Sequence, residues 1–374
     1  MRNFTFKRQL LFVMFMLLGC LSIQAANDGL ITKQITIKLD EAGTLPDRIS
    51  ESRKFLITNL KIVGEVNGTD WLLIREMAGC DHGLGKTDGK LSILDLSDAK
   101  IVKGGLPYVA RLDNEQYTSN DELGSYAFYG CSGLTSLTLP SSVTSIGSYA
   151  FYGCSGLTSL TLPSSVTSIG YKAFAYCSGL TSLTLPSSVT SIGDEAFVYC
   201  SGLTSLTIPS CVTSIGDEAF AYCSGLTSLT IPSSVTSIGE SAFKGCSGLT
   251  SLTIPSGVTS IGSYAFYGCS GLTSIYVYLE KTPKLGKDIF KECDAKICTV
   301  YVPTGTYDDY FVSEFGYFEN IVEFDATGID KVTTSTDAKE LSRYSVNGQR
   351  LSAPAKGLNI VKYSDGSVKK VVVQ

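Results

Sequence analysis

One stretch of sequence recurs six times in this chain. The string CSGLTSLTLPSSVTSIGSYAF begins at Cys131 and returns, nearly unchanged, every 23 residues. Self-similarity at a period of this length is typical of a solenoid, in which each repeat forms one coil. One coil cannot bury its apolar side alone, so we expect the copies to stack and cover one another. Further copies begin at Cys154, Cys177, Cys200, Cys223 and Cys246, and a last start at Cys269 becomes irregular.

The first half of each copy predicts a strand. After Cys131, apolar residues alternate with hydroxyl residues, which is the pattern of a half-buried strand. We expect Leu137 and Leu139 to point into the core and Thr138 to face solvent. Pro140 then ends the strand, because proline has no amide hydrogen to donate to a sheet.

The second half of each copy completes the coil. Val143 and Ile146 mark a second short extended segment, and Ala150 and Phe151 begin a short helical or 3₁₀ turn that covers the core. In a stack that is in register, each residue lies ~4.8 Å from its own copy in the adjacent coils. The predicted fold is therefore a repeat solenoid with a parallel β-sheet on one side and short helical turns on the other.

The consensus of the copies is L-x-x-L-x-L-P-x-x-V-x-x-I-G-x-x-A-F-x-x-C, which resembles the BspA-like leucine-rich repeats of bacterial surface proteins. The resemblance covers residues 122–292, while residues 35–101 resemble the N-terminal cap of such proteins and residues 299–324 their closing coil. It implies binding or adhesion at the cell surface, often to host proteins. The Asn or Cys ladder of general leucine-rich repeats is replaced here by Ser142, Ser165, Ser188, Cys211, Ser234 and Gly257.

The N-terminus predicts export. Basic residues precede an apolar run from Leu10 to Leu21, and the small residues Ala25 and Ala26 follow, which is the pattern of a signal peptide over residues 1–25. The run is too short to span a bilayer, so no transmembrane segment is expected after signal removal. The alternative is a lipoprotein signal with Cys20 lipidated. Both predict a protein that is secreted or at the cell surface, on the outer-membrane exterior rather than in the periplasm.

The C-terminal tail predicts a small β-sandwich-like domain, because two alternating segments flank the hairpin signal Asp365-Gly366. This tail resembles the C-terminal sorting domain of type IX secretion, which implies export or outer-membrane attachment through it. The expected order is a signal peptide (1–25), an N-terminal cap with an irregular leucine-rich region (27–121), the solenoid with a degenerate closing coil (122–324), a linker (325–340) and the β-domain (341–374).

Twelve cysteines in an exported chain would ordinarily indicate disulfides. Seven of them fall in one column of the solenoid, where neighbouring side chains point the same way. We expect this column to be a buried ladder of thiols that pack as small hydrophobic groups. Cys293 and Cys298, at the irregular end, are the pair that we expect to form a bridge. The sequence contains no C-x-x-C, and no metal or cofactor is expected.

Enzymatic chemistry has few candidates. His82 is the only histidine and lies in a Gly-rich segment, where we expect a solvated loop residue. Glu195 and Glu218 occupy one position in consecutive copies, and a separation of about 5 Å would match the carboxylate pair of a retaining glycosidase. The array offers these carboxylates no cleft, so we expect a solvated acidic strip. A carbohydrate-active enzyme that uses Glu195 and Glu218 is the first alternative to a binding protein. A passive structural spacer is the second alternative.

The binding candidates lie beside each alanine-phenylalanine pair. Tyrosines recur at one position in three copies, and exposed tyrosines are frequent interface anchors, although such rings can also pack over the coil edges. Neighbouring carboxylates would steer a basic partner. The candidates are Tyr176, Tyr199, Tyr222, Asp194, Glu195, Asp217 and Glu218.

The overall charge excludes one class of partner. The net charge is −5 and only 17% of the residues are charged, so the chain lacks the basic patch that nucleic-acid binding needs. The sequence therefore predicts an exported, non-enzymatic binding or adhesion protein. Its expected partners are proteins, among them proteins of a host surface or matrix.

Overall fold

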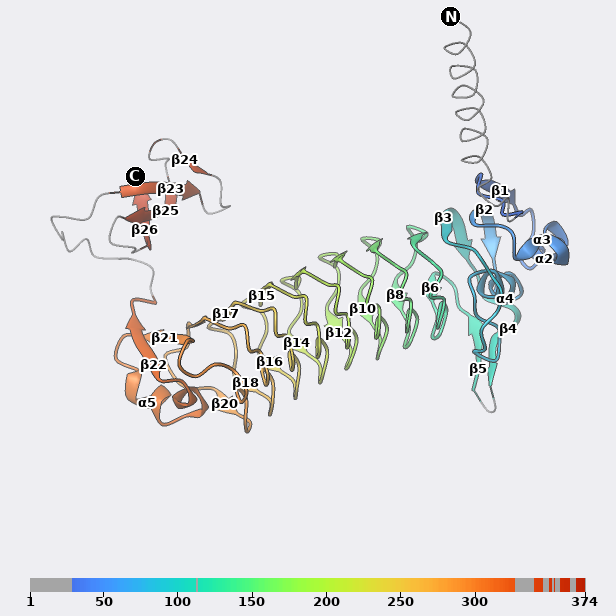
Figure 1. Ribbon diagram of the computed structural model, residues 1–374. Helices are drawn as coiled ribbons and strands as arrows, with labels where there is room; N and C mark the ends of the chain where they lie inside the picture. Colours follow the sequence, from blue (N-terminus) through green and yellow to red (C-terminus); the bar gives the residue numbers. More distant parts are fainter. Residues whose placement is uncertain are drawn as a thin grey trace, which may run out of the picture.

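The computed structural model describes part of the chain, and within that part residues 29–326 form an elongated stack of coils (Figure 1). The expected signal peptide, Cys20 and nearly all of the expected linker lie outside the described residues. The described ranges are 29–111, 114–326, 340–345, 350–351, 353, 357–363 and 368–373.

One wall of the stack is a parallel sheet in which each strand pairs in register with its copy in the next coil, so Leu137 lies opposite Leu160. Eight strands follow in the order β1 (Ile35–Lys38), β2 (Asn59–Val66), β3 (Ile93–Ile101), β7 (Ser136–Thr138), β9 (Ser159–Thr161), β11 (Ser182–Thr184), β13 (Ser205–Thr207) and β15 (Ser228–Thr230). A four-stranded parallel sheet continues the wall with β17 (Ser251–Ile254), β19 (Ser274–Val277), β21 (Thr299–Pro303) and β22 (Asn320–Phe324).

A second wall is built from the shorter extended segment of each copy. Its strands also pair in parallel with their copies, so Ile146 lies opposite Ile169. The eight strands are β6 (Glu122–Leu123), β8 (Ser145–Ile146), β10 (Ser168–Ile169), β12 (Ser191–Ile192), β14 (Ser214–Ile215), β16 (Ser237–Ile238), β18 (Ser260–Ile261) and β20 (Lys284–Leu285).

The alternation of side chains agrees with the sequence. Leu137 and Leu139 are buried and Thr138 is exposed, and the same pattern recurs along the wall. The leucines of one coil lie directly above those of the next, and together they form one continuous hydrophobic core. Burial of this core is the main favourable contribution to the stability of the stack.

The third side of each coil is a run of hydrogen-bonded turns closed by i→i−3 bonds, which is the 3₁₀ form of the expected turn and does not continue as a helix. The Ala150 amide donates to Gly147 O in its own turn (3.2 Å), whereas the Phe151 amide donates to Ala173 O in the next coil (2.7 Å). Because every second amide bonds outside its own coil, the i→i−3 or i→i−4 series that a helix requires cannot continue.

The phenylalanine of each turn closes the core, as the sequence predicts. The rings lie nearly parallel along the axis of the stack, with centroids 4.9 to 5.7 Å apart. The column contains Phe128, Phe151, Phe174, Phe197, Phe220, Phe243, Phe266 and Phe290.

The bonds between turns all run in one direction, from an amide to a carbonyl in the next coil. The first turn therefore presents carbonyl groups with no preceding coil, and buried carbonyls need donors. The N-terminal region supplies them. The Tyr108 hydroxyl donates to Ser125 O (2.8 Å), and Ala127 O accepts from Trp71 Nε1 (3.1 Å) and from the buried guanidinium of Arg75 (3.1 Å).

These donors are held by the elements before the first copy. Trp71 and Arg75 lie one turn apart on one face of α4 (Gly68–Met77), and a capping box between Asn67 and Asp70 fixes the start of that helix. The remaining elements of this region are α2 (Leu45–Arg48), α3 (Glu51–Lys54) and an antiparallel hairpin of β4 (Gly104–Arg111) and β5 (Asn114–Thr118).

The other end of the stack is closed by α5 (Tyr307–Phe311) and η1 (Glu314–Tyr317). Phe315 and Phe318 cover Phe290, the last ring of the column, with centroid distances of 5.0 and 5.2 Å. The Glu314 carboxylate accepts from the Ile289 amide (3.4 Å). This end thus receives an acceptor, whereas the N-terminal end receives donors.

The described strands of the C-terminal segment form one antiparallel sheet. Strands β25 and β26 pair as expected for a hairpin, while the Asp365-Gly366 turn itself lies outside the described residues. The order is β24 (Arg350–Leu351), β23 (Glu340–Ser345), β25 (Gly357–Tyr363) and β26 (Val368–Val373).

A serine ladder fills the position that general leucine-rich repeats give to asparagine. The Ser165 hydroxyl donates to Val143 O of the preceding coil (2.5 Å), and Ser188 donates to Val166 O (2.5 Å). A short hydroxyl therefore links adjacent coils directly. Cys211 occupies this position in one coil, and its side chain is exposed.

The cysteine column is a buried ladder, as predicted. Each thiol from Cys154 onward donates to a phenylalanine carbonyl of the preceding coil, at 3.0 to 3.4 Å. The predicted bridge between Cys293 and Cys298 is wrong, because both are free. Cys293 instead extends the ladder by donating to Phe266 O, so its sulfur is directed into the core.

We expect Leu206→Ala to lower the free energy of unfolding by about 2–5 kcal/mol, because it opens a cavity in a central coil where Leu206 is 4% exposed. Thr207→Ala, on the solvent side of the same strand, is the matched control and is expected to cost less than about 1 kcal/mol. Urea unfolding measures both. Equal losses would contradict the inward and outward assignment.

We expect one fast-reacting thiol among the eleven described cysteines of the folded chain, and Cys211→Ser should remove it. Burial raises the pKa of Cys154, Cys200 and Cys246 well above the usual thiol value, so these groups neither ionise nor meet the reagent. Ellman titration in native buffer and in guanidinium measures the difference. Rapid labelling of several thiols in native buffer would refute the buried ladder.

Candidate functional site

Two positions in every turn have a left-handed backbone, which costs a residue with a Cβ atom about 1–2 kcal/mol. The side chain at the first position varies from coil to coil, and φ is 52° to 60° at Tyr126, Tyr149, Lys172, Glu195, Glu218, Ser241 and Tyr264. At the second position φ is 60° to 71°, and the residues are Gly130, Gly153, Tyr176, Tyr199, Tyr222, Gly245 and Gly268.

Three consecutive coils thus carry tyrosine where the flanking coils carry glycine. The rings of Tyr176 and Tyr199 stack with centroids 4.8 Å apart, and those of Tyr199 and Tyr222 with centroids 4.6 Å apart. Tyr176 is 43% exposed and Tyr199 is 40% exposed. The Tyr222 ring lies against Gly245, where an added Cβ would come within 2.7 Å of it.

Beneath these rings lies a second, smaller hydrophobic cluster. Ala175, Val198 and Ala221 are buried there, and Tyr152 and Tyr222 pack against them. Packing of the rings over the coil edges, one of the two roles expected from the sequence, is thus present. The rings cover the turns, and Tyr176 and Tyr199 also remain available on the surface.

The stack extends in both directions along the turns. Tyr152 contacts Tyr176 (5.2 Å between centroids), and Lys244 Nζ lies over the rings of Tyr222 (5.9 Å) and Tyr267 (5.4 Å). We call this surface the tyrosine ridge. It consists of Tyr126, Tyr129, Tyr149, Tyr152, Tyr171, Tyr176, Tyr199, Tyr222, Tyr264 and Tyr267.

Glu195 lies next to the ridge and is already engaged. Its carboxylate pairs with Lys172 Nζ (3.0 Å) and accepts from the Tyr171 hydroxyl (2.9 Å). Hydrogen bonds to Tyr171 and Glu195 raise the pKa of Lys172 above its usual value. The expected acidic strip is therefore neutralised at this coil.

The two aspartates of the expected strip accept hydrogen bonds from amides of the next coil. Asp194 Oδ1 accepts from the Asp217 amide (2.9 Å), and Asp217 Oδ1 accepts from the Glu240 amide (2.7 Å). Asp217 and Glu218 are exposed, whereas Glu195 is half-buried. The glutamates of the alternative glycosidase pair thus differ in surroundings, because Glu195 is held by Lys172 and Glu218 faces solvent.

The outer face of the long sheet carries the repeated hydroxyls, and these also bond between coils. The Thr181 hydroxyl donates to Thr158 O (3.1 Å), and the Thr204 hydroxyl donates to Thr181 O (3.3 Å). The protons of this threonine column are therefore used within the stack.

This face ends in aromatic residues that were not among the candidates expected from the sequence. In register with Thr253, the next two strands carry Tyr276 and Tyr301, whose rings stack with centroids 4.6 Å apart. The Phe324 ring meets Tyr276 edge-on at 6.2 Å. The available signal was the change from SLTLP or SLTIP in the regular copies to SIYVY at residues 274–278.

The fold assembles no catalytic or metal site around the other residues considered from the sequence, among the residues that the structure describes. The backbone carbonyl of His82 accepts from the Ala110 amide (3.0 Å), which ties its loop to the N-terminal hairpin. Among the described residues, no group of three or more His, Cys, Asp or Glu side chains could hold a metal ion. Across the same residues, every helix is too short or too polar to cross a membrane.

The family model described as a BspA-type leucine-rich repeat region in six copies matches residues 121–249, 190–314 and 236–338, which together span more than half of the chain. No curated protein matches the sequence.

Several solved structures are similar to the chain. A leucine-rich repeat protein from Bacteroides ovatus is 26% identical with a TM-score of 0.41, over 63% of this chain and 70% of that chain. A leucine-rich repeat protein from T. pallidum is 29% identical with a TM-score of 0.38, over 49% of this chain and 79% of that chain. A leucine-rich cell surface protein from Faecalibacterium prausnitzii is 22% identical with a TM-score of 0.33, over 78% and 87%.

Proposed function

The chain belongs to the family of BspA-type leucine-rich repeat proteins, and on this premise we propose that it is an exported, non-enzymatic binding protein that holds protein partners on its tyrosine ridge. Repeat solenoids present extended surfaces of this kind to partners. The partners that fit the proposal are proteins of a host surface or matrix, and the proposed location is the cell exterior.

The observation that carries the proposal is the tyrosine at a left-handed position. Tyr176, Tyr199 and Tyr222 take the place that Gly153 and Gly245 hold in the flanking coils, at a backbone cost that glycine avoids. Strained residues that persist at a surface point to a role beyond stability. Stacked, exposed rings provide rigid apolar area with little loss of side-chain entropy on binding.

Charge beside the ridge supports a preference among partners. Asp217 and Glu218 are exposed next to Tyr199 and Tyr222, while Glu195 is already paired with Lys172. A partner with basic residues would be steered to this part of the ridge, and its association rate would fall as salt increases. Lys244 at one end of the stack limits the acidic region to a short stretch.

The C-terminal sheet is proposed to serve export or attachment. Its resemblance to a type IX sorting domain and the signal-like N-terminus support a route to the outer-membrane exterior. Cys20 as a lipid anchor is the alternative route. Mass spectrometry of the mature protein, isolated from the cell surface, would distinguish a chain that begins after Ala25 from one that begins at a lipidated Cys20.

The ridge is tested by replacing its three central tyrosines together, as Tyr176→Gly, Tyr199→Gly and Tyr222→Gly. We expect capture by a panel of immobilised extracellular-matrix proteins to fall at least about tenfold, because tyrosine anchors each contribute more than about 1 kcal/mol. The melting temperature should fall only modestly, since Tyr222→Gly uncovers part of the cluster of Ala175, Val198 and Ala221. Relief of about 1 kcal/mol of strain at each site offsets the loss of about 0.5–1.5 kcal/mol per ring pair.

The matched control changes three hydroxyls on the long sheet, as Thr161→Ala, Thr184→Ala and Thr207→Ala. This control should bind as the unchanged protein does. Loss of capture in the threonine variant with retention in the tyrosine variant would place the site on the hydroxyl face. Unchanged capture by both variants would refute a role for the tyrosine ridge and for the hydroxyl face.

A glycan-release assay tests the enzymatic alternative. We expect no product from the unchanged protein, because Glu195 is held by Lys172 and cannot act as an unencumbered acid or nucleophile opposite Glu218. Release of sugar that disappears in Glu195→Gln and in Glu218→Gln would establish the enzyme instead.

A further inference from the structure

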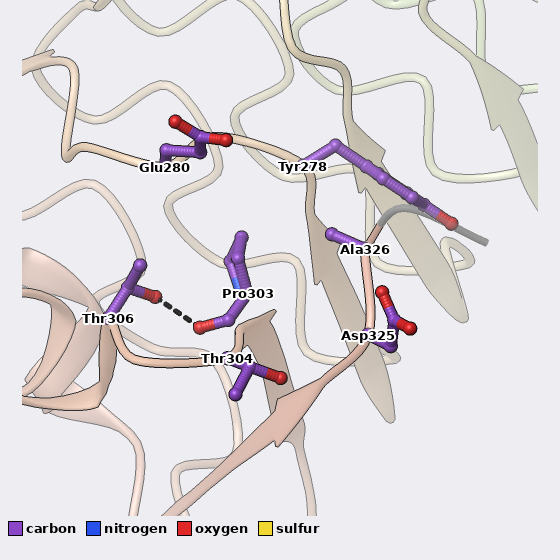
Figure 2. A pocket seen from close by; sticks show the side chains of 7 residues that line it. All are labelled: Tyr278, Glu280, Pro303, Thr304, Thr306, Asp325 and Ala326. Atoms are coloured by element: carbon purple, nitrogen blue, oxygen red, sulfur yellow. Dashed lines mark hydrogen bonds between the residues drawn. The ribbon is translucent and has the colours of Figure 1, made fainter. Parts of the chain in front are cut away.

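A pocket of about 510 Å³ lies at the closing end of the long wall, away from the tyrosine ridge. It forms where the chain leaves three adjacent strands. Tyr278 and Glu280 follow β19, Thr304 follows β21 and Asp325 follows β22. Figure 2 shows Glu280 on one side of Pro303 and Asp325 with Tyr278 on the other.

The walls of this pocket are firmly positioned. The Thr306 hydroxyl donates to Pro303 O (2.7 Å), and the Thr304 hydroxyl donates to Phe324 O (3.2 Å). The Tyr278 ring meets Phe324 edge-on, with centroids 5.3 Å apart. These contacts position the tyrosine ring and the turn after β21.

The charge of the lining is of one sign. Glu280 and Asp325 are both exposed in the pocket, and the described lining contains no lysine, arginine or histidine. The neighbour of Glu280 in sequence, Lys281, is not part of the lining. Two carboxylates at the mouth of a concave surface concentrate negative potential there and favour a cation.

We propose that this pocket binds the guanidinium group of an arginine side chain in a peptide segment of a partner protein. A guanidinium is planar, pairs with carboxylates through several N–H groups and stacks on aromatic rings such as Tyr278. A free amino acid would bring its own carboxylate towards Glu280 and Asp325 and would be repelled. An arginine within a peptide brings no such charge, and the volume leaves room for its neighbours.

The hydroxyls favour this ligand over a neutral sugar. Thr304 and Thr306 already donate their protons to backbone carbonyls, so towards a ligand they act as acceptors. A guanidinium consists only of donors and matches this lining, whereas a sugar hydroxyl must both donate and accept.

The experiment uses the mature full-length protein and titrates a fluorescent peptide, acetyl-Gly-Gly-Arg-Gly-Gly-amide, by anisotropy. The matched probe replaces arginine with citrulline, which has nearly the same shape and no charge. We expect binding of the arginine peptide, weaker binding as salt increases, and no binding of the citrulline peptide. Glu280→Gln and Asp325→Asn should each weaken binding by about fivefold, the upper range for an exposed ion pair.

Two controls separate this site from general charge and from the ridge. Glu319→Gln removes an exposed carboxylate at the same end but outside the pocket, and the triple tyrosine-to-glycine variant alters only the ridge. Both should bind the arginine peptide normally. Equal binding of arginine and citrulline, no response to either pocket variant, or binding of maltotriose in place of the peptide would overturn the proposal. Because the ridge variant is independent, either proposal can fail alone.

Discussion

The hydrogen bonds between turns all point in one direction along the stack. Each end of the stack must therefore supply the donors or acceptors that the missing neighbouring coil would have provided. Each amide that leaves a turn reaches a carbonyl in the next coil, so the two ends of the stack differ chemically. The N-terminal end is covered by donors, Trp71 Nε1 and the Arg75 guanidinium among them, and the closing end receives the Glu314 carboxylate. A buried arginine without a carboxylate partner is costly in most proteins, and here backbone carbonyls take the place of the acid.

The regular part of the fold was predictable because one short pattern is repeated in register. Burial of Leu206 and exposure of Thr207 follow from alternation alone, and the thiol ladder follows from the cysteine spacing. The ends were not predictable in the same way. Cys293 comes 24 residues after Cys269, whereas the repeat has 23. Because of this extra residue, the spacing did not predict that Cys293 belongs to the ladder. The contact between Arg75 and the first turn joins residues far apart in sequence, which periodicity cannot reveal.

The candidate site was found in part for the same reason. A column of Tyr176, Tyr199 and Tyr222 is visible from spacing, and the structure brings the three rings together. What spacing cannot give is backbone conformation, so the left-handed φ angles and the pairing of Glu195 with Lys172 appear only in three dimensions. The backbone angles and this ion pair alter the description of the tyrosine column and its neighbours. The rings occupy strained positions, and of the glutamates beside them Glu195 is paired with Lys172 while Glu218 is exposed.

Because the central coils are nearly identical in sequence, their number can change without altering the rest of the fold. Along the long sheet every interface between them joins the same serine, leucine and threonine, so a coil can be inserted or deleted there without a new strand contact. Both end caps remain unchanged by such an event. Each one alters the length of the stack by ~4.8 Å, the spacing between paired strands. Chains that differ by whole coils would therefore carry the same two end caps at separations that differ in equal steps.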